Sequence, residues 1–200
     1  MSAEAMLDFL DASSPESRLG FQAAFHCGPV LKGVKSSNVM TAEPGTWRKL
    51  QRAFRGSSIL CVLLAVHRGR EVLLLYRYRR LQSLLEDAKV KDFLRSRGYE
   101  DMTVAAVIIR LRGRYAGYAL AGQEFPHELG VILEYPLEDV KGFIENKGRN
   151  CLMEKYWKVY HDRERAAHLF ARYDRARERA VEEVCAGYPL GQIAVEEIGR

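Results

Sequence analysis

The sequence predicts an α+β fold, with a single domain over residues 1–187 and a C-terminal tail over residues 188–200. Apolar runs typical of strands alternate irregularly with amphipathic helical patterns, unlike the regular alternation of a doubly wound fold. The 200 residues are 48% hydrophobic and 28% charged, as in a globular domain that buries its own core. We therefore expect a mostly antiparallel or mixed sheet of four or five strands, covered on one side by helices.

The first part of the chain has helical patterns over residues 4–11, 16–27 and 46–54. The second of these helices is expected to end at Cys27, because Gly28-Pro29 follows and interrupts a helix. Residues 30–44 contain Gly33, Ser36, Ser37 and Asn38 and are expected to form a loop.

A β-hairpin is predicted next, because two apolar runs, 58–67 and 71–78, flank Arg68-Gly69-Arg70. The first run is continuously apolar, so its strand is expected to be central and buried on both faces. The apolar residues between Leu81 and Leu94 recur at helical spacing and predict one or two helices, closed by Gly98.

The second half of the chain is expected to combine helices with short strands. Helices are predicted to begin after Thr103, at Pro136 and after Asp162. The first helix is expected to give way to a loop at Gly113, Gly117 and Gly122. The second is expected to run through Lys147, with Glu138 and Asp139 near its positive end. The third is expected to end at Gly187. Strands are predicted over residues 129–134 and 152–160.

The net charge of +5 makes the chain mildly basic, which permits an anionic partner without requiring one. Arginines cluster between Arg68 and Arg80 and again on the last helix, where acidic residues interrupt them. No nucleic-acid-binding motif accompanies these clusters. A solvated, ion-paired face is therefore favoured, and a nucleic-acid partner is not expected.

The N-terminus has neither the basic segment nor the long apolar stretch of a secretory signal. The longest apolar run, residues 59–66, is too short to cross a bilayer, so we expect a soluble, cytoplasmic protein without a membrane partner. The four cysteines contain no CxxC pair, which excludes a zinc ribbon or thioredoxin motif and predicts free thiols. No phosphate-binding or dinucleotide-binding motif is present, and the cofactor stays unknown.

Three motif segments carry a resemblance to a known family. Residues 25–35 are similar to its His-Cys-Ala-Pro-Thr-Leu-x-Gly-x-Lys pattern, and residues 125–144 to Phe-Pro-His-Glu-Ile-Gly-x-Phe-Leu-Gly-Tyr-Pro-x-Glu-Asp-Val. Residues 156–160 match its Tyr-Trp-Lys-Val-Tyr segment. Over about residues 18–178 the chain thus resembles the bacterial family called domain of unknown function 3793, found mainly in anaerobic Gram-positive bacteria. Glu134 stands where this pattern has Gly, and Ala176 where it has Cys.

Packing does not obviously require the His, Cys, Lys, Glu and Tyr side chains of these segments. The candidate pocket residues are His26, Cys27, Lys35, His127, Glu128, Tyr156, Lys158 and Tyr160. An imidazole beside a thiol can form a nucleophile or a metal site. Adjacent helical residues point about 100° apart, however, so a buried structural role is favoured for Cys27.

Two readings stay open for the other candidates. His127 either orders the loop after Pro126 or acts as a base or metal ligand completed by His26 or Cys27. On a strand, Tyr156, Lys158 and Tyr160 share one face, which could bind an anion or a flat ring, while Trp157 and Val159 face the core.

Two functions are weighed. The first is a small-ligand-binding or catalytic protein of anaerobic iron or redox metabolism. The resemblance implies this link, because genes of that family often lie near flavodoxin and iron-uptake genes. The first function expects His26, His127 and Lys158 to converge on one pocket. The alternative is a non-catalytic interaction module that docks an acidic partner, such as a flavodoxin, on its positive charge. The sequence identifies no reaction and no metal.

Overall fold

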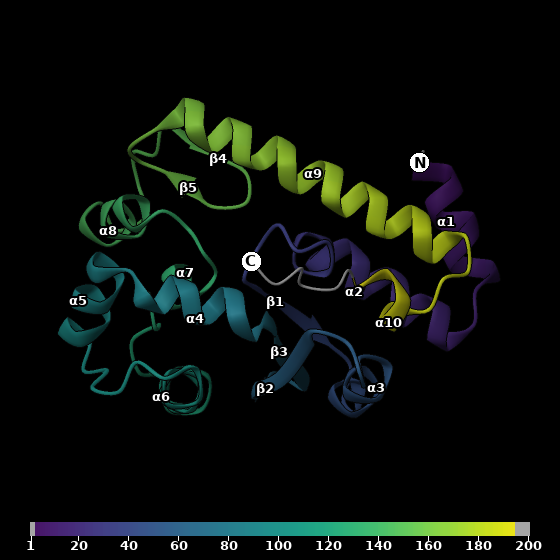
Figure 1. Cartoon of the computed structure of the whole chain (residues 1–200), viewed down its shortest axis with the longest axis horizontal. Helices are drawn as coiled ribbons and strands as arrows, with labels where there is room; N and C mark the ends of the chain where they lie inside the picture. Colours follow the sequence, from purple (N-terminus) through teal and green to yellow (C-terminus); the bar gives the residue numbers. More distant parts are fainter. Residues whose placement is uncertain (1–2, 195–200) are drawn as a thin grey trace.

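The computed structural model describes residues 3–194, which form ten helices and five strands (Figure 1). The strands are β1 (Ser37–Ala42), β2 (Ile59–His67), β3 (Arg70–Arg77), β4 (Met153–Glu154) and β5 (Lys158–Val159). The first helices are α1 (Ala3–Ala12), α2 (Pro15–Leu31), α3 (Thr46–Ala53), α4 (Tyr78–Glu86) and α5 (Ala88–Ser96). They are followed by α6 (Val104–Ala121), α7 (Leu129–Ile132), α8 (Leu137–Glu145), α9 (Arg163–Cys185) and α10 (Leu190–Ile193). The predicted α+β class is confirmed.

The strands form two antiparallel sheets, one in the order β1-β3-β2 and one made of β4 and β5. The prediction of one sheet with four or five strands is therefore wrong. The predicted β2–β3 hairpin is confirmed, but its second strand is the central one and β2 lies at the edge. Both runs are equally apolar, so the sequence did not reveal that β1 would pair with β3.

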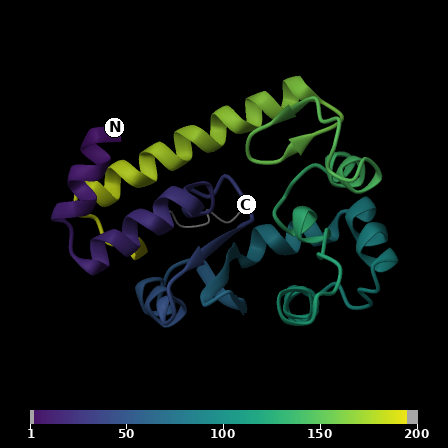
Figure 2. The ribbon, with the colours of Figure 1, turned by 180° about the vertical axis from the view of Figure 1, so that it is seen from behind.

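The central strand β3 sends alternate side chains into two cores. Leu73 and Leu75 pack with apolar residues of α2, α3 and α9, whereas Val72 and Leu74 pack with those of α4, α5 and α6. Helices therefore cover both faces of the sheet, and not one face as predicted. A third, smaller core joins Trp157 and Val159 to the first half of α9. The hairpin β4–β5 lies beneath this end of α9 and beside α8 in both views (Figure 2).

The helix that was expected to end at Cys27 continues through Gly28-Pro29 to Leu31. Pro29 costs one helical hydrogen bond near the end of α2, and packing against α9 outweighs this cost. The carbonyl of Pro29 accepts the N–H groups of Val34 and Lys35 at 2.9 and 3.1 Å, which turns the chain toward β1. The expected loop 30–44 thus contains a strand, because pairing with β3 overrides its loop-like composition.

Gly28 allows the backbones of α2 and α9 to approach closely. A Cβ at this position would lie 2.7 Å from the Cα of Arg177, so Gly28→Ala must push the two helices apart. We expect a loss of about 1–3 kcal/mol in the free energy of unfolding, despite the better helix propensity of alanine. Gly113, inside α6, is the matched control, because a Cβ there meets nothing within 4 Å. Gly113→Ala should stabilise by about 1 kcal/mol in urea denaturation, and a gain for both variants would contradict the close approach.

Two predictions for the second half of the chain are wrong. Helix α6 does not end at Gly113 but runs to Ala121, where Gly122 caps it at φ +65°. The expected strand 129–134 is the short helix α7, because the carbonyls of Pro126, His127 and Glu128 accept the N–H groups three residues ahead. A short apolar run fits either structure, and this one pairs with no strand of the described sheets.

The last third of the chain follows the predicted order. Thr103 and Asp162 cap α6 and α9 through their side chains, as expected. The expected strand 152–160 is instead the hairpin of β4 and β5. Within the expected tail, α10 packs Leu190 and Ile193 into the first core, and residues 195–200 lie outside the described residues. None of the described helices is long and apolar enough to span a membrane.

Candidate functional site

A pocket of about 350 Å³ lies where the second and third motif segments meet. We call it the hairpin pocket and define it by Phe125, His127, Tyr135, Phe143, Tyr156, Trp157 and Lys158. Its volume and its mainly apolar, aromatic wall are typical of small-ligand sites. The structure thus brings together three of the eight candidate residues: His127, Tyr156 and Lys158.

The imidazole of His127 lies in the pocket wall between two phenylalanine rings. Its centroid is 5.5 Å from those of Phe125 and Phe143. The backbone carbonyl of His127 accepts the N–H of Gly130, so the backbone orders the turn into α7. The ring itself has no hydrogen bond to any residue of the described range. Its nitrogens are therefore open to a ligand.

Lys158 adds a cation to the lining of the same pocket. Its Nζ donates a hydrogen bond to the carbonyl of Gly148 at 2.9 Å and lies 3.7 Å from Oε2 of Glu154. Because an ammonium has three donors, Lys158 keeps hydrogen-bonding capacity for an anionic group. Tyr156 donates its hydroxyl to Oδ1 of Asp174 at 3.0 Å, and burial raises the pKa of Tyr156 to about 12, so it is neutral at physiological pH.

Asp139 holds the hairpin in place. Its Oδ2 accepts the indole N–H of Trp157 at 2.7 Å, and its Oδ1 accepts the backbone N–H groups of Tyr160 and His161 at 2.7 and 3.0 Å. Trp157 in turn stacks on Tyr135, with ring centroids 5.0 Å apart. The sequence placed Asp139 correctly in the first turn of a helix, but it gave no sign of this contact.

Tyr160 lies behind the pocket and does not line it. Its side chain packs on Gly142, where an added Cβ would approach the Cβ of Tyr160 to 2.6 Å. The hydroxyl of Tyr160 is buried without a hydrogen-bond partner among the described residues. We assign Tyr160 to the packing of α8 against β5.

Glu128 is fully buried away from the hairpin pocket. Its carboxylate pairs with Arg114 of α6 and accepts the hydroxyl of Tyr99 at 3.1 Å. These contacts tie α6 to the start of α7 and explain why a glutamate stands in the motif. Its role in this structure is to hold the scaffold.

His26 and Cys27 lie on α2 and do not line the hairpin pocket. Cys27 is buried in the core, and burial raises the pKa of its thiol to about 12, so it is not a thiolate nucleophile at neutral pH. His26 is exposed and packs edge-on against Phe25, with centroids 5.5 Å apart. Within residues 3–194, no three His, Cys, Asp or Glu side chains form a group that could hold a metal ion.

The side chain of Lys35 is buried, with 1% of its surface exposed, and its ammonium group forms no ion pair with a carboxylate of the described residues. Its Nζ donates to Oδ1 of Asn38 at 2.7 Å and lies 5.0 and 5.6 Å from the ring centroids of Tyr135 and Tyr173. Burial lowers the pKa of Lys35 to about 8 from its usual value of 10.5. The two rings partly replace the lost hydration of the ammonium.

This lowered pKa makes a pH-dependent contribution to stability. Between pH 8 and 10 the folded state has lost the proton of Lys35 while the unfolded state keeps it, so stability rises with pH. The wild type and the Lys35→Met variant share the other groups that titrate in this range, which are cysteines and tyrosines. From pH 8 to pH 10 we therefore expect the free energy of unfolding of the wild type to rise by about 2 kcal/mol relative to that of Lys35→Met. Urea denaturation of both proteins at several pH values checks this, and parallel curves would contradict it.

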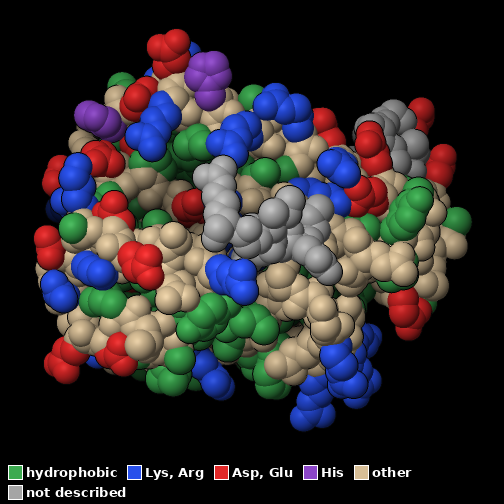
Figure 3. All heavy atoms as spheres, in the orientation of Figure 1, with side chains coloured by type: hydrophobic (Ala, Val, Ile, Leu, Met, Phe, Trp, Pro, Cys, Tyr) green, Lys and Arg blue, Asp and Glu red, His purple; other side chains and the backbone are tan. Residues whose placement is uncertain are grey.

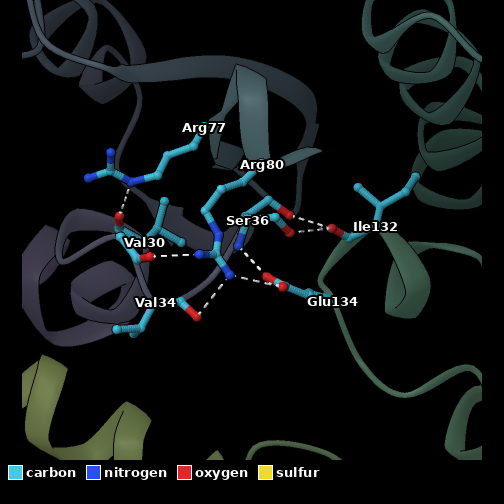
Figure 4. Close-up of polar contacts among 9 residues, drawn as sticks. Val30, Val34, Ser36, Arg77, Arg80, Ile132 and Glu134 are labelled. Carbon is cyan, nitrogen blue, oxygen red and sulfur yellow. Dashed lines mark hydrogen bonds and ion pairs between the residues drawn. The ribbon is translucent and has the colours of Figure 1, made fainter. Parts of the chain in front are cut away.

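Arg80 and Glu134 join the first two motif segments (Figure 4). The guanidinium of Arg80 donates to the carbonyl of Gly33 at 2.9 Å and pairs with Glu134 at 3.1 Å. Glu134 also accepts the backbone N–H of Ser36. Its φ of +60° lies in the left-handed region, which favours glycine and explains the Gly of the family pattern. In this chain the ion pair and the hydrogen bond offset that strain.

One family model matches the chain, over residues 23–194, and is described as a protein of unknown function, DUF3793. The match covers all three motif segments and every residue that defines the hairpin pocket. No curated protein and no solved structure matches the chain. The family resemblance of the motif segments is therefore confirmed, and the chain belongs to the DUF3793 family.

Proposed function

We propose that this protein is a soluble, cytoplasmic bacterial protein that binds a small, flat, anionic ligand in the hairpin pocket. The observation that carries the proposal is an imidazole without a hydrogen bond in the described chain, beside an ammonium, on an aromatic wall. A flat apolar body would pack on Phe143 and Trp157, and its acidic group would be oriented by Lys158. The link to anaerobic iron or redox metabolism rests on the family resemblance alone.

The arrangement supports recognition better than it supports a defined reaction. Tyr156 is held neutral and is committed to Asp174, and the buried Cys27 lies outside the pocket. His127 is the pocket residue whose imidazole can accept a proton. A ligand with an ionisable hydrogen next to the ligand's own ring could transfer that proton to His127.

The first experiment is native mass spectrometry of protein purified from an anaerobic host, followed by thermal-shift titration with aromatic carboxylates such as 2-naphthoate. A ligand at a hundred times its Kd should raise the free energy of unfolding by about 2.7 kcal/mol. Lys158→Met should weaken binding roughly tenfold, because it removes the cation but keeps the length of the side chain.

Two exposed residues outside the pocket provide matched controls, Lys141→Met and His168→Ala. Both should bind like the wild type, whereas His127→Ala and Lys158→Met should not. Absence of any bound mass and of any thermal shift across the carboxylate series would refute the proposal. So would equal losses in the pocket variants and the control variants.

A second candidate function, docking of an acidic partner such as a flavodoxin, is favoured by the charge on α3. This helix and the two residues that follow it include four exposed cations, Arg48, Lys49, Arg52 and Arg55. None of these side chains is ion-paired within the described part of the chain. Arg48 and Arg52 lie four residues apart on one face of α3, and Arg55 lines the same shallow pocket. Figure 3 shows Lys and Arg side chains gathered over α3 at the lower right.

Docking on this helix would be screened by salt. The test is titration with a flavodoxin at low and physiological salt by biolayer interferometry, where affinity should fall steeply as salt rises. Arg48→Glu with Arg52→Glu should abolish binding, whereas Arg112→Glu with Arg149→Glu, an equal change at other exposed positions, should not. An affinity that does not change with salt, or that falls equally in the two charge-reversal variants, would exclude α3 as the docking surface.

A further inference from the structure

A second pocket, of about 430 Å³, lies between α9 and the segments that contain α4 and α5. We call it the arginine pocket and define it by Arg80, Lys89, Tyr135, Arg165, Arg172 and Tyr173. Figure 3 shows this face hollowed below α9, with Lys and Arg side chains along its upper part. Tyr135 lines both pockets, so the two sites are neighbours.

The cations of this pocket outnumber its available carboxylates. Glu134 is engaged by Arg80 and Ser36, and Asp87 caps α5 by accepting the N–H of Val90 at 3.0 Å. The side chains of three cations, Lys89, Arg165 and Arg172, pair with no carboxylate of the described residues. Against them stands one further carboxylate on the lining, Glu138, which is likewise unpaired within that range.

The two arginines of α9 approach the pocket from one side. Arg165, Leu169 and Arg172 follow at intervals of four and three residues, which places them on one helix face. Arg80 of α4 and Arg172 of α9 line the pocket together with Tyr173, so guanidinium groups from both helices border one cavity. Guanidinium groups bind oxyanions with paired N–H donors, which favours phosphoryl and carboxylate groups over halide ions.

A buried charge reinforces this field from behind. The ammonium of Lys35 lies 5.0 and 5.6 Å from the centroids of Tyr135 and Tyr173, the two rings that form the aromatic wall of the pocket. Its hydrogen-bond partner, Asn38, is neutral. Low-polarity surroundings weaken the screening of such a charge, so it attracts an anion on the other side of the rings.

We propose that the arginine pocket is a binding site for a multivalent oxyanion, in the form of a pyrophosphate or polycarboxylate group of a small metabolite. Lys89, Arg165 and Arg172 bind its oxygens, and Tyr173 forms the wall against which it rests. Glu138 opposes binding and limits the affinity for monovalent anions. This inference stands apart from the hairpin pocket and does not depend on the ligand proposed there.

The test is isothermal titration calorimetry of the full chain with pyrophosphate, and separately with citrate and with inorganic phosphate. Saturable binding of pyrophosphate or citrate, stronger than that of phosphate, is expected, and the tighter of the two identifies the source of the oxyanion. Arg165→Gln with Arg172→Gln should weaken this binding at least about tenfold. Glu138→Gln should tighten it about threefold or more, because it removes the opposing charge.

The matched control is Arg163→Gln with Arg175→Gln, which removes the same charge from exposed positions of α9 that do not line the pocket. It should change the Kd less than about twofold. Equal weakening by the two double variants would overturn the proposal, because binding would then follow net charge. Lack of saturation with pyrophosphate and citrate up to roughly 10 mM would overturn it as well. Circular dichroism spectra of all variants verify that each is folded.

Discussion

Replacing Arg77 by methionine is expected to lower the free energy of unfolding by about 2–6 kcal/mol. Arg77 ends β3 and is fully buried. Its Nε donates to the carbonyl of Val30 at 2.6 Å (Figure 4), and its Nη2 donates to that of Leu31 at 2.8 Å. These carbonyls belong to the last turn of α2, where the carbonyl of Val30 also accepts the N–H of Gly33 at 3.0 Å and that of Leu31 accepts no backbone N–H of the described residues. Without the guanidinium, two hydrogen bonds from a charged donor are lost, each contributing about 1.5–3 kcal/mol, and the carbonyl of Leu31 is left unsatisfied.

Arg79→Met is the matched control, because Arg79 lies two residues further on and is exposed. It should change the free energy of unfolding by less than about 0.5 kcal/mol. Arg77→Lys should recover only part of the loss, since one ammonium cannot repeat the fork of the guanidinium. Urea denaturation of the three variants decides the matter. A loss for Arg77→Met no larger than that for Arg79→Met would show that Arg77 does not cap α2.

Arg77 also shows why the arginine clusters of the sequence are not one surface. Arg68 and Arg70 lie at the exposed hairpin turn, whereas Arg77 is buried and Arg80 is half-buried against Glu134. Composition counts all of them as one basic segment. They differ because β3 pairs with β1, and this pairing brings Arg77, at the end of β3, to the last turn of α2. On α9 the ion-paired face was expected, and Arg177 and Arg179 do pair with Asp174 and Glu183.

Local signals were sufficient where neighbouring residues determine the structure. Thr103 and Asp162 accept N–H groups three residues ahead, so each cap is contained in a short segment of sequence. The strand β1 and the helix α7 depend instead on distant partners. β1 forms because its edge meets β3, and α7 is held by the carboxylate of Glu128 against Arg114 and Tyr99. Neither partner can be read from the segment itself.

The candidate site shows the same division. The alternation of the aromatic segment correctly placed Trp157 and Val159 in the core and left Tyr156 and Lys158 to line a pocket with His127. The motif segments could not show which of them meet in space. Lys35 of the first segment lies behind the arginine pocket, whereas Lys158 lines the hairpin pocket. The structure therefore has two pockets where the sequence favoured one.

The second large effect is expected at Asp139. Asp139→Ala removes a carboxylate, buried at 3% exposure, that accepts from Trp157, Tyr160 and His161. Hydrogen bonds to a charged group contribute about 1.5–3 kcal/mol each, and the three share one carboxylate, so we expect a loss of about 3–5 kcal/mol. Denaturation in urea measures this loss. Glu138→Ala is the control, because Glu138 precedes it in the same first turn but is exposed; removing its favourable position near the helix N-terminus should cost about 0.3–1 kcal/mol.

A second readout separates the hairpin from the rest of the fold. Trp47→Phe leaves Trp157 as the one tryptophan of the chain, so its emission reports on the hairpin pocket alone. In this background Asp139→Ala should shift the emission to longer wavelength, because Trp157 loses its contact with the carboxylate and becomes exposed to water. Binding of the ligand proposed for the hairpin pocket should be lost as well. Asp139→Asn keeps the size of the side chain but replaces one acceptor oxygen with an NH₂ group, which would then face one of the N–H donors. It should therefore shift the emission in the same direction as Asp139→Ala. An unchanged emission in both variants would mean that packing on Tyr135 and Phe170 holds Trp157 without the carboxylate.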